Sequence, residues 1–593
     1  MFKFLKNFFI EIKRREINLF KIIKSHLEWD KKLIEKLFSK KEGEQKLPNL
    51  KQLTYLPFLL NKKEKIKIVI FSGLIIICLI FLLFRIYLRL PLKPVSGGQY
   101  TEGIVGELSS INPIVLENDV NLDLSRLIFS SLVKWKNTQI VPDLAKSWQK
   151  EEGGKKYIFN LRENVFWHDG KKFSADDVIF TIEMIKNEKI NSHFRKGLAN
   201  IKVKKINDHQ LEFSLEQPFS PFLTLLVFGI IPKHLWEKVS VENFSSSKLN
   251  ISPIGTGPFK LKDLVKDENG KIKTIVLEKN KKYYLDGPYL EKINLKFFEN
   301  PEEALIALQK KKIDGLALST IENGGNLPKF INSYKLTLSS YTAIFLNQKD
   351  KILTKKIREA LALSIDKKKI VEELKNVKEL NTAIVHPNFK GKVKEYTYDP
   401  ILASQKIKKE GYQKRGRWFT DKKGKVLEIN LVVLDLPRYK KVGEMIKNFW
   451  EEIGLKVNLK VLEKSNFEKA VKEKKYSALL YSIIEGYDPD PFPLWHSSQI
   501  EKGLNLANFK DIRLDSLLEK ARMSFDESER KKYYQEFQEL ISKEIPAIFL
   551  YQLNFEYLVD QKIKGINSIY TPFLSDRLAN IEDWYIYLKR SLK

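Results

Sequence analysis

The sequence predicts an α/β protein of two lobes that follows a single membrane-spanning helix. Patterns typical of strands alternate with patterns typical of helices over most of the chain, which indicates mixed α/β layers, and the number of these units indicates two lobes. One apolar run, from Ile66 to Phe84, has the length of a helix that crosses a membrane. The chain has 593 residues, of which 43% are hydrophobic and 30% charged, so we expect a soluble bulk with more than one folded unit.

The composition excludes several classes of protein. The mean hydropathy of −0.31 excludes a polytopic membrane protein. The net charge of +30 would suggest nucleic-acid binding if it were clustered, but lysines alternate with glutamates and no reader motif is present. Cys78 is the only cysteine, the histidines lack metal-site spacing, and no Gly-x-Ser-x-Gly motif occurs. The sequence therefore predicts no nucleic-acid partner, no metal, no cofactor and no catalytic residue.

The apolar run is predicted to be an uncleaved anchor at residues 66–90, followed by a linker at 91–100. Four lysines lie between residues 62 and 67, against three basic residues between 85 and 93, which predicts a cytoplasmic N-terminus. The alternatives are a cleaved signal peptide and a lipoprotein modified at Cys78. However, the run begins some sixty residues into the chain, and small residues suited to processing do not flank Cys78 or follow the run.

The segment 1–65 is rich in lysine and arginine, and its apolar residues recur at helical spacing. One interpretation is a cytoplasmic amphipathic helix that lies on the anionic inner leaflet. The other is a small helical hairpin that packs on itself or on a partner. Both stay open.

Several elements after the linker are predicted from local patterns. Residues 156–162 alternate apolar and polar side chains, as in a half-buried strand. Ser174, with Asp177 three residues later, predicts the start of a helix. Two further strand-then-helix pairs are expected, at residues 342–347 with 356–364 and at residues 426–434 with 439–453.

Five blocks of sequence carry a resemblance to a known family. They are Val141 to Trp148, Tyr157 to Val178 with its Trp-His-Asp-Gly motif, Gly255 to Phe259, Ile357 to Asp366, and Tyr487 to Phe492. In this order they resemble the extracellular solute-binding proteins of family 5, the dipeptide, oligopeptide and nickel receptors of ABC importers. The resemblance covers about Gly103 to the C-terminus.

The resemblance implies a periplasmic-binding-protein-like fold of class II type with hinged lobes. Lobe one would be residues 101–340 and 546–593, and lobe two residues 341–545, with hinges near Ser340 and Ile545. It also implies a receptor that is not an enzyme, with an ABC permease and ATPase complex as partners.

Two motifs have both a chemical and a structural interpretation. Trp167-His168-Asp169-Gly170 contains a His/Asp pair, but adjacent strand residues point to opposite faces, so we interpret it as a turn. Gly255-Thr-Gly257 lacks the Gly-Lys-Ser/Thr ending of a phosphate loop and precedes a strand-like pattern. We therefore expect a tight turn there too.

The ligand contact is predicted in the segment from Tyr481 to His496. A peptide carries a free ammonium group, and burying that charge requires a carboxylate partner. In peptide receptors of the family, an aspartate three residues before an Asp-Pro pair takes this role, and the matching position here is Glu485, one methylene longer. The predicted ligand-binding residues are Glu485, Tyr481, Tyr487, Asp488 and Trp495.

For Asp488 and Asp490 the alternatives are a metal or hydrolytic carboxylate pair and a structural role at a turn and a helix start. The predicted function is that of an extracytoplasmic receptor, anchored by one helix, that captures di- to oligopeptides by lobe closure and delivers them to a permease. The alternatives are a tethered sensor without a role in uptake, a receptor for nickel or another solute, and a hydrolase.

Overall fold

The computed structural model describes residues 60–115, 118–136, 138–319, 327–567 and 570–591. The chain forms two compact units, one of Met1–Lys93 with Lys589–Lys593 and one of Pro94–Leu588. Most of the predicted N-terminal basic segment, residues 1–59, lies outside the described residues.

The first unit contains helix α5 (Lys62–Arg89). Its N-terminus has a capping box, in which the Glu64 amide donates to Asn61 Oδ1 (3.0 Å) and the Asn61 amide donates to Glu64 Oε2 (2.9 Å). No residue of the helix is buried. By length and composition α5 is the one helix of the described part that could cross a membrane, and it includes the whole predicted apolar run.

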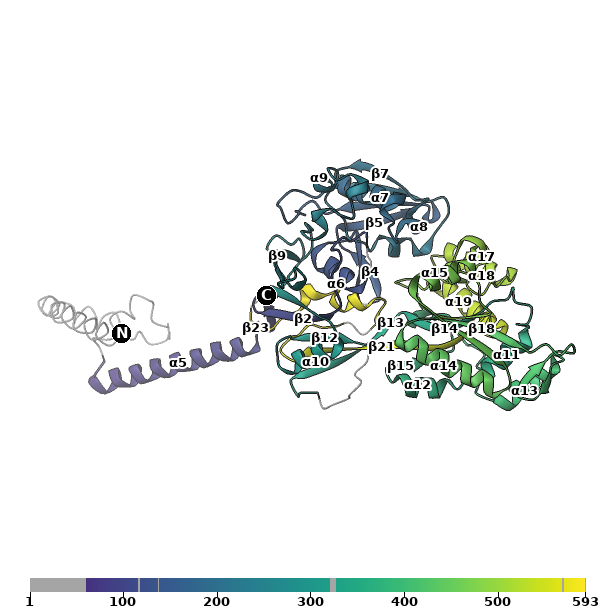
Figure 1. Cartoon of the computed structure of the whole chain (residues 1–593). Coiled ribbons are helices and arrows are strands. Elements are labelled where there is room, and N and C mark those ends of the chain that lie inside the picture. The colour runs from purple at the N-terminus through teal and green to yellow at the C-terminus, as the bar shows by residue number, and fades with distance from the viewer. Residues whose placement is uncertain (1–59, 116–117, 137, 320–326, 568–569, 592–593) are drawn as a thin grey trace, which may run out of the picture. The chain divides into compact units, whose positions relative to one another are not determined.

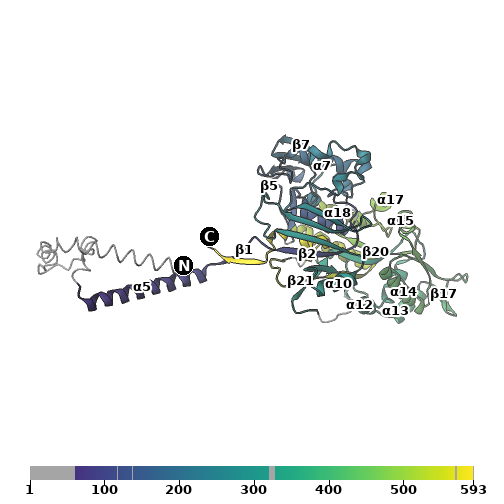
Figure 2. The same ribbon diagram turned by 60° about the vertical axis from the view of Figure 1, so that its left-hand side comes forward.

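The second unit is built on a thirteen-stranded mixed sheet that passes through two lobes (Figure 1). Its main path runs β19-β18-β20-β14-β21-β12-β2-β11-β10-β9, and Figure 2 shows β2, β20 and β21 from another side. The strands on the side of the N-terminal lobe are β2 (Gln99–Val105), β9 (Phe259–Lys266), β10 (Ile272–Lys279), β11 (Lys292–Phe298), β12 (Gly315–Leu318) and β13 (Ile331–Leu338). Those of the other lobe are β14 (Ser340–Leu346), β15 (Val377–Glu379), β18 (Glu428–Leu434), β19 (Lys456–Leu462) and β20 (Ala478–Ile484).

Helices and smaller sheets cover this sheet. The N-terminal lobe carries α6 (Asp119–Ile128), α7 (Ala175–Lys186), α8 (Arg195–Leu198), α10 (Pro301–Gln309) and a four-stranded sheet of β5 (Ala145–Glu151), β6 (Lys156–Leu161), β8 (Gln210–Ser214) and β7 (Lys202–Asn207). The other lobe carries α11 (Lys355–Leu363), α12 (Lys367–Leu374), α13 (Pro400–Lys409), α14 (Pro437–Glu452), α15 (Lys464–Glu473), α18 (Ile512–Met523) and α19 (Glu527–Glu544). Each lobe has its own hydrophobic core.

The local predictions for this unit are confirmed. Strand β6 alternates buried and half-buried residues, and α7 starts after Ser174 with Asp177 in a capping box. The predicted strand-helix pairs appear as β14 with α11 and β18 with α14. The predicted linker 91–100 differs, because it contains strand β1 (Leu92–Val95) and the start of β2.

Two antiparallel strands connect the lobes. The first crossing lies at Ser339, between β13 and β14, beside the predicted boundary. The second lies within β21 (Ala547–Asp560), whose first half pairs with β14 and whose second half pairs with β12 and β13. Because Ile548 and Leu550 pack in the core of the second lobe, the chain changes lobe after the predicted boundary at residue 546.

Candidate functional site at the end of strand β20

Strand β20 has a free edge. It pairs with β14 along its whole length, but on its other side it pairs with β18 only at Ala478 and Leu479. Residues 480–484 therefore have no strand partner on that side within the described part of the chain, and Ile484 is 61% exposed. An unpaired edge offers backbone donors and acceptors to an extended chain.

Glu485 follows this edge directly and lies against the first crossing between the lobes. Its amide donates to the Ser339 carbonyl (2.8 Å). Its carboxylate accepts hydrogen bonds from the Val385 amide (2.9 Å) and from the Ser339 hydroxyl (3.1 Å). These donors are neutral, and no ion pair to Glu485 occurs among the residues that the structure describes.

Burial raises the pKa of the half-buried Glu485 to about 8, although its hydrogen bonds act in the opposite direction. Burial also lowers the pKa of the neighbouring His386 to about 4, so this imidazole is neutral at pH 7. Among the described residues, the site therefore holds an acid without a countercharge.

The other two acids of the segment are paired with arginines. Asp488 forms a bidentate ion pair with Arg530 (2.9 and 3.0 Å), and Asp490 accepts from Arg522 (2.6 and 2.9 Å). Asp490 also accepts from the Phe492 amide at the start of α16 (Phe492–Trp495). These contacts favour the structural interpretation of both aspartates over a hydrolytic pair. The prediction that Asp488 contacts ligand is not favoured, because Arg530 occupies its carboxylate.

Tyr487 reaches from the second lobe to the N-terminal lobe. Its hydroxyl donates to Asp576 Oδ1 (3.0 Å) and accepts from Arg126, which also pairs with Asp576 (2.6 Å). Its ring lies 5.2 Å from that of Trp135 and 5.3 Å from that of Phe573. The predicted pocket wall Tyr487 is therefore a contact between the lobes.

Trp495 is a core residue in this structure, and its role as a ligand-binding residue stays a prediction. It is 1% exposed and packs in the core of the second lobe, 5.7 Å from Phe345 and 6.2 Å from Phe549 between ring centroids. By contrast, Tyr481 stacks on Phe467 (6.0 Å) at the wall of a cavity of about 880 Å³. Two aromatic residues of the same segment, Tyr481 in β20 and Trp495 in α16, thus differ in role in a way that residue type alone does not show.

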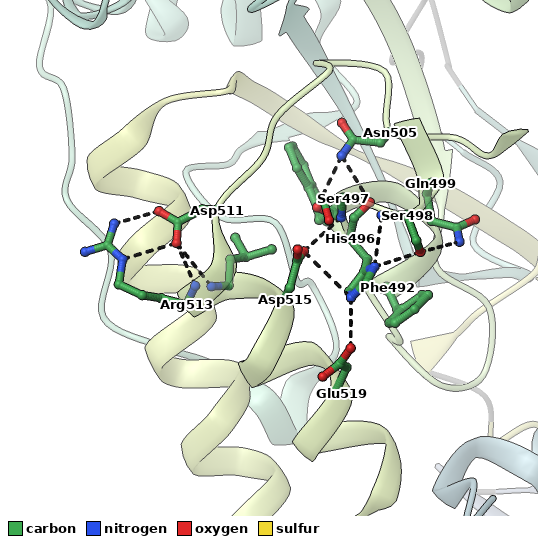
Figure 3. Close-up of polar contacts among 12 residues, drawn as sticks. Phe492, His496, Ser497, Ser498, Gln499, Asn505, Asp511, Arg513, Asp515 and Glu519 are labelled. Atoms are coloured by element: carbon green, nitrogen blue, oxygen red, sulfur yellow. Dashed lines mark hydrogen bonds and ion pairs between the residues drawn. The ribbon is translucent and has the colours of Figure 1, made fainter. Parts of the chain in front are cut away.

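The chain beyond Trp495 is held by a polar cluster (Figure 3). His496 Nε2 lies 3.3 Å from Glu519 Oε1, and the Ser497 amide donates to Asp515 (2.8 Å). Asn505 donates to the carbonyls of Trp495 and His496. No group of three or more potential metal ligands occurs in the described residues, and we interpret the cluster as a support for the segment that carries Glu485.

The two motifs with alternative interpretations pack against each other. His168 Nδ1 accepts from the Gly255 amide (3.2 Å), and His168 Nε2 donates to the Gly257 carbonyl (3.1 Å). Burial lowers the pKa of His168 to about 4, so it is neutral. A Cβ atom at Gly255 would lie 1.9 Å from the Ile128 carbonyl oxygen, so glycine is needed for close backbone approach. Both motifs are therefore structural, as predicted.

Comparison with known proteins identifies the family. A model of bacterial extracellular solute-binding proteins, family 5 (middle), matches residues 139–502, which is more than half of the chain. The chain belongs to this family. Members of family 5 of the solute-binding proteins are receptors for solutes rather than enzymes, and their solute-binding part is extracytoplasmic.

Individual family members cover nearly the same length. The oligopeptide-binding protein AppA of Bacillus subtilis (strain 168) is 26% identical over 516 residues, 83% of this chain and 92% of that protein. The dipeptide-binding protein of Escherichia coli (strain K12) is 24% identical and covers 78% of this chain and 90% of its own. The solved structure of AppA with a nonapeptide has a TM-score of 0.68 at 25% identity, covering 84% of this chain and 100% of that one. The solved structure of Campylobacter jejuni NikZ with Ni(L-His) has a TM-score of 0.67 at 30% identity, and the match covers 82% of this chain and 99% of that one.

Proposed function

We propose that this protein is a membrane-anchored extracytoplasmic receptor that captures peptides and delivers them to an ABC permease and ATPase complex. The observation that carries the proposal is Glu485, a half-buried carboxylate with neutral donors around it and no cationic partner in the described residues. A peptide ammonium supplies the missing positive charge.

The energetics favour such a ligand. The Glu485 carboxylate accepts neutral hydrogen bonds from the Ser339 hydroxyl and from the amides of Val385 and His386, and a carboxylate with about four lone-pair sites can still accept from a further donor. In the empty site the acid is mostly protonated at pH 7, since its pKa is about 8. An arriving ammonium favours the ionised form, so ligand binding and loss of this proton are coupled.

The free edge of β20 supports a peptide rather than a compact solute. Backbone hydrogen bonds to residues 480–484 would hold an extended chain with little regard to its side chains. AppA and the Escherichia coli relative are named for oligopeptide and dipeptide binding, which is consistent with this proposal.

Closure of the lobes follows from the position of Glu485. Its amide and carboxylate both contact Ser339, the residue at the first crossing. A ligand held at Glu485 and touched by the N-terminal lobe stabilises the closed arrangement, and so shifts an equilibrium between open and closed forms.

Helix α5 is proposed as the anchor, with the N-terminus cytoplasmic. Its apolar side chains are exposed, Phe71 for example at 65%, and need a nonpolar environment. Alkaline carbonate extraction of cell membranes tests this: an anchored chain stays in the membrane pellet at full length, whereas a cleaved signal sequence gives a shorter, soluble product.

The test of peptide binding is calorimetry on the full-length protein in detergent. Tri-alanine with a free N-terminus should bind, and N-acetyl-tri-alanine should bind at least thirtyfold more weakly. Glu485→Gln should abolish this discrimination. Glu428→Gln, which changes a surface glutamate paired with Lys456 in the same lobe, is the matched control. Equal affinity for both peptides would contradict the proposal.

Two other functions, a receptor for another solute and a membrane-tethered sensor, can be distinguished by further tests. NikZ was solved with Ni(L-His), so binding of a nickel–histidine chelate without any peptide binding would favour a receptor for that class of solute. Co-purification of the N-terminal segment with a kinase, rather than with permease or ATPase subunits, would favour a sensor.

A further inference from the structure

A cavity of about 880 Å³ opens where strands β18 and β20 separate. The two strands pair only as far as Val432 and Leu479. Beyond that point Leu434 from β18 and Tyr481 from β20 line the cavity, together with residues of α15. The cavity is therefore continuous with the free edge that leads to Glu485.

The walls of this cavity are largely apolar. They include Leu434, Leu436, Phe467, Val471 and Leu504. Leu436 and Leu504 are 47% and 48% exposed, so these apolar side chains lack cover in the ligand-free protein. Insertion of an apolar ligand side chain would remove this surface from water.

The rim of the cavity is positively charged. Three lysines line the cavity and form no ion pair within the described residues: Lys196 from α8 of the N-terminal lobe, Lys464 and Lys472. Lys474 is engaged with the carbonyls of Ile500 and Asn505. The acids of the lining are Glu468 and Glu501, the latter paired with Lys349 (3.3 Å). Four lysines against two glutamates leave a net positive charge.

The distance from Glu485 to the cavity determines how long a peptide must be to reach the cavity. Tyr481 precedes Glu485 by four positions on an extended strand, which is about 13 Å at about 3.3 Å per residue. A peptide ligand that lies extended along the same edge has the same rise per residue. Its fourth or fifth residue therefore arrives at the cavity.

We infer that the cavity is a second ligand subsite, which selects peptides of four or more residues with an apolar side chain near position four and an acidic group after it. This inference rests on the proposed function, because it takes the ammonium at Glu485 as the starting point. Di- and tripeptides would bind only through Glu485 and the strand edge and would leave the cavity empty.

A nested set of peptides tests the inference by calorimetry on the full-length protein in detergent. We expect Ala-Ala-Ala-Phe-Glu to bind at least tenfold more tightly than Ala-Ala-Ala, and more tightly than Ala-Ala-Ala-Phe-Lys. Leu504→Asp, which places a charge on the apolar wall, should weaken the pentapeptide tenfold and leave the tripeptide unchanged. Ile512→Asp, at a 79% exposed apolar residue outside the cavity, is the matched control.

The outcomes separate this inference from the proposed function. If the tripeptide binds through its free amine and the pentapeptide gains nothing, the second subsite is wrong and peptide binding stands. Equal weakening of both peptides by Leu504→Asp also overturns the subsite. If no peptide of any length binds, the proposed function itself is wrong. The double variant Lys464→Glu with Lys472→Glu should invert the preference between terminal Glu and Lys, and an unchanged preference would overturn the acidic selection.

Discussion

Glu102 and Glu485 are both shielded carboxylates, one in each lobe, and they differ in their partners. Glu102, fully buried in β2, accepts from Arg577 (2.8 and 3.0 Å) and from the Tyr557 hydroxyl (3.0 Å). Glu485 accepts only from neutral groups. The first carboxylate connects β2 to Arg577 in the C-terminal part of the chain, whereas the second, on our proposal, binds the cation of a ligand. On this proposal, an acid that is paired with a cation of the chain stabilises the fold, and an acid without such a partner is available to a ligand.

The largest expected effect is the loss of stability on Arg577→Ala. Arg577 is 2% exposed and also pairs with Asp123 (2.6 and 2.8 Å), so its removal leaves two buried carboxylates without a cation. Removal of one partner from a buried ion cluster costs about 3–5 kcal/mol. Thermal or urea unfolding of the full-length protein measures this loss, with Arg513→Ala at an exposed pair with Asp511 as the control. Equal effects of the two variants would break the comparison.

Asp488→Asn tests, inside the candidate site, the distinction between an acid that is paired within the chain and an acid that is not. Asp488 is three positions from Glu485 but is paired with the buried Arg530. The change should lower the free energy of unfolding by about 1.5–3 kcal/mol, the range for a hydrogen bond to a charged group. Glu485→Gln should lower it by much less while weakening peptide binding. If Asp488→Asn reduced peptide affinity with unchanged stability, Asp488 would be a ligand contact after all.

His168→Phe should have a smaller effect on stability. The imidazole joins the backbone at Gly255 and Gly257. A phenyl ring leaves the Gly255 amide without this partner, while the Gly257 carbonyl keeps its hydrogen bond from Asn280 Nδ2 (3.0 Å). Since one buried donor is left unsatisfied, the expected loss is about 1–3 kcal/mol, measured by unfolding, with peptide affinity unchanged. His193→Phe, at an exposed histidine of the same lobe, is the control. A loss of ligand binding at full stability would contradict the structural role of His168.

Much of the fold was predictable because local chemistry determines it. The alternation in β6 and the capping box at Ser174 and Asp177 act within a few residues, and both appear as expected. The apolar run was predictable from composition alone, and α5 extends it by four residues at its N-terminal end and by five at its C-terminal end. Glu485 was singled out through the family resemblance, from its place before an Asp-Pro pair, and its role stays a prediction.

The partners of the site residues were not predictable, since they come from distant parts of the chain. Nothing near Asp488 indicates Arg530, and nothing near Tyr487 indicates Arg126 or Asp576. The core position of Trp495 also depends on tertiary packing. The change of lobe within β21 was missed because one uninterrupted strand serves both lobes, so no break in the sequence marks it.

The last expected effect is a dependence of stability on pH that belongs to Glu485 alone. The ordinary pKa of a glutamate is 4.5 and burial raises that of Glu485 to about 8, so between these values the folded protein holds a proton that the unfolded chain has lost. The free energy of unfolding must then fall as pH rises from 4.5 to 8.

Glu485→Gln lacks this pH dependence, so its stability relative to the natural chain should be least at pH 5 and should increase up to pH 8. Unfolding midpoints of both proteins without ligand at pH 5, 6.5 and 8 measure it, and their difference cancels the other titrating groups. A saturating peptide should abolish the trend, because its ammonium restores the ionised acid; a trend of opposite sign would mean that a cation of the chain itself already meets Glu485.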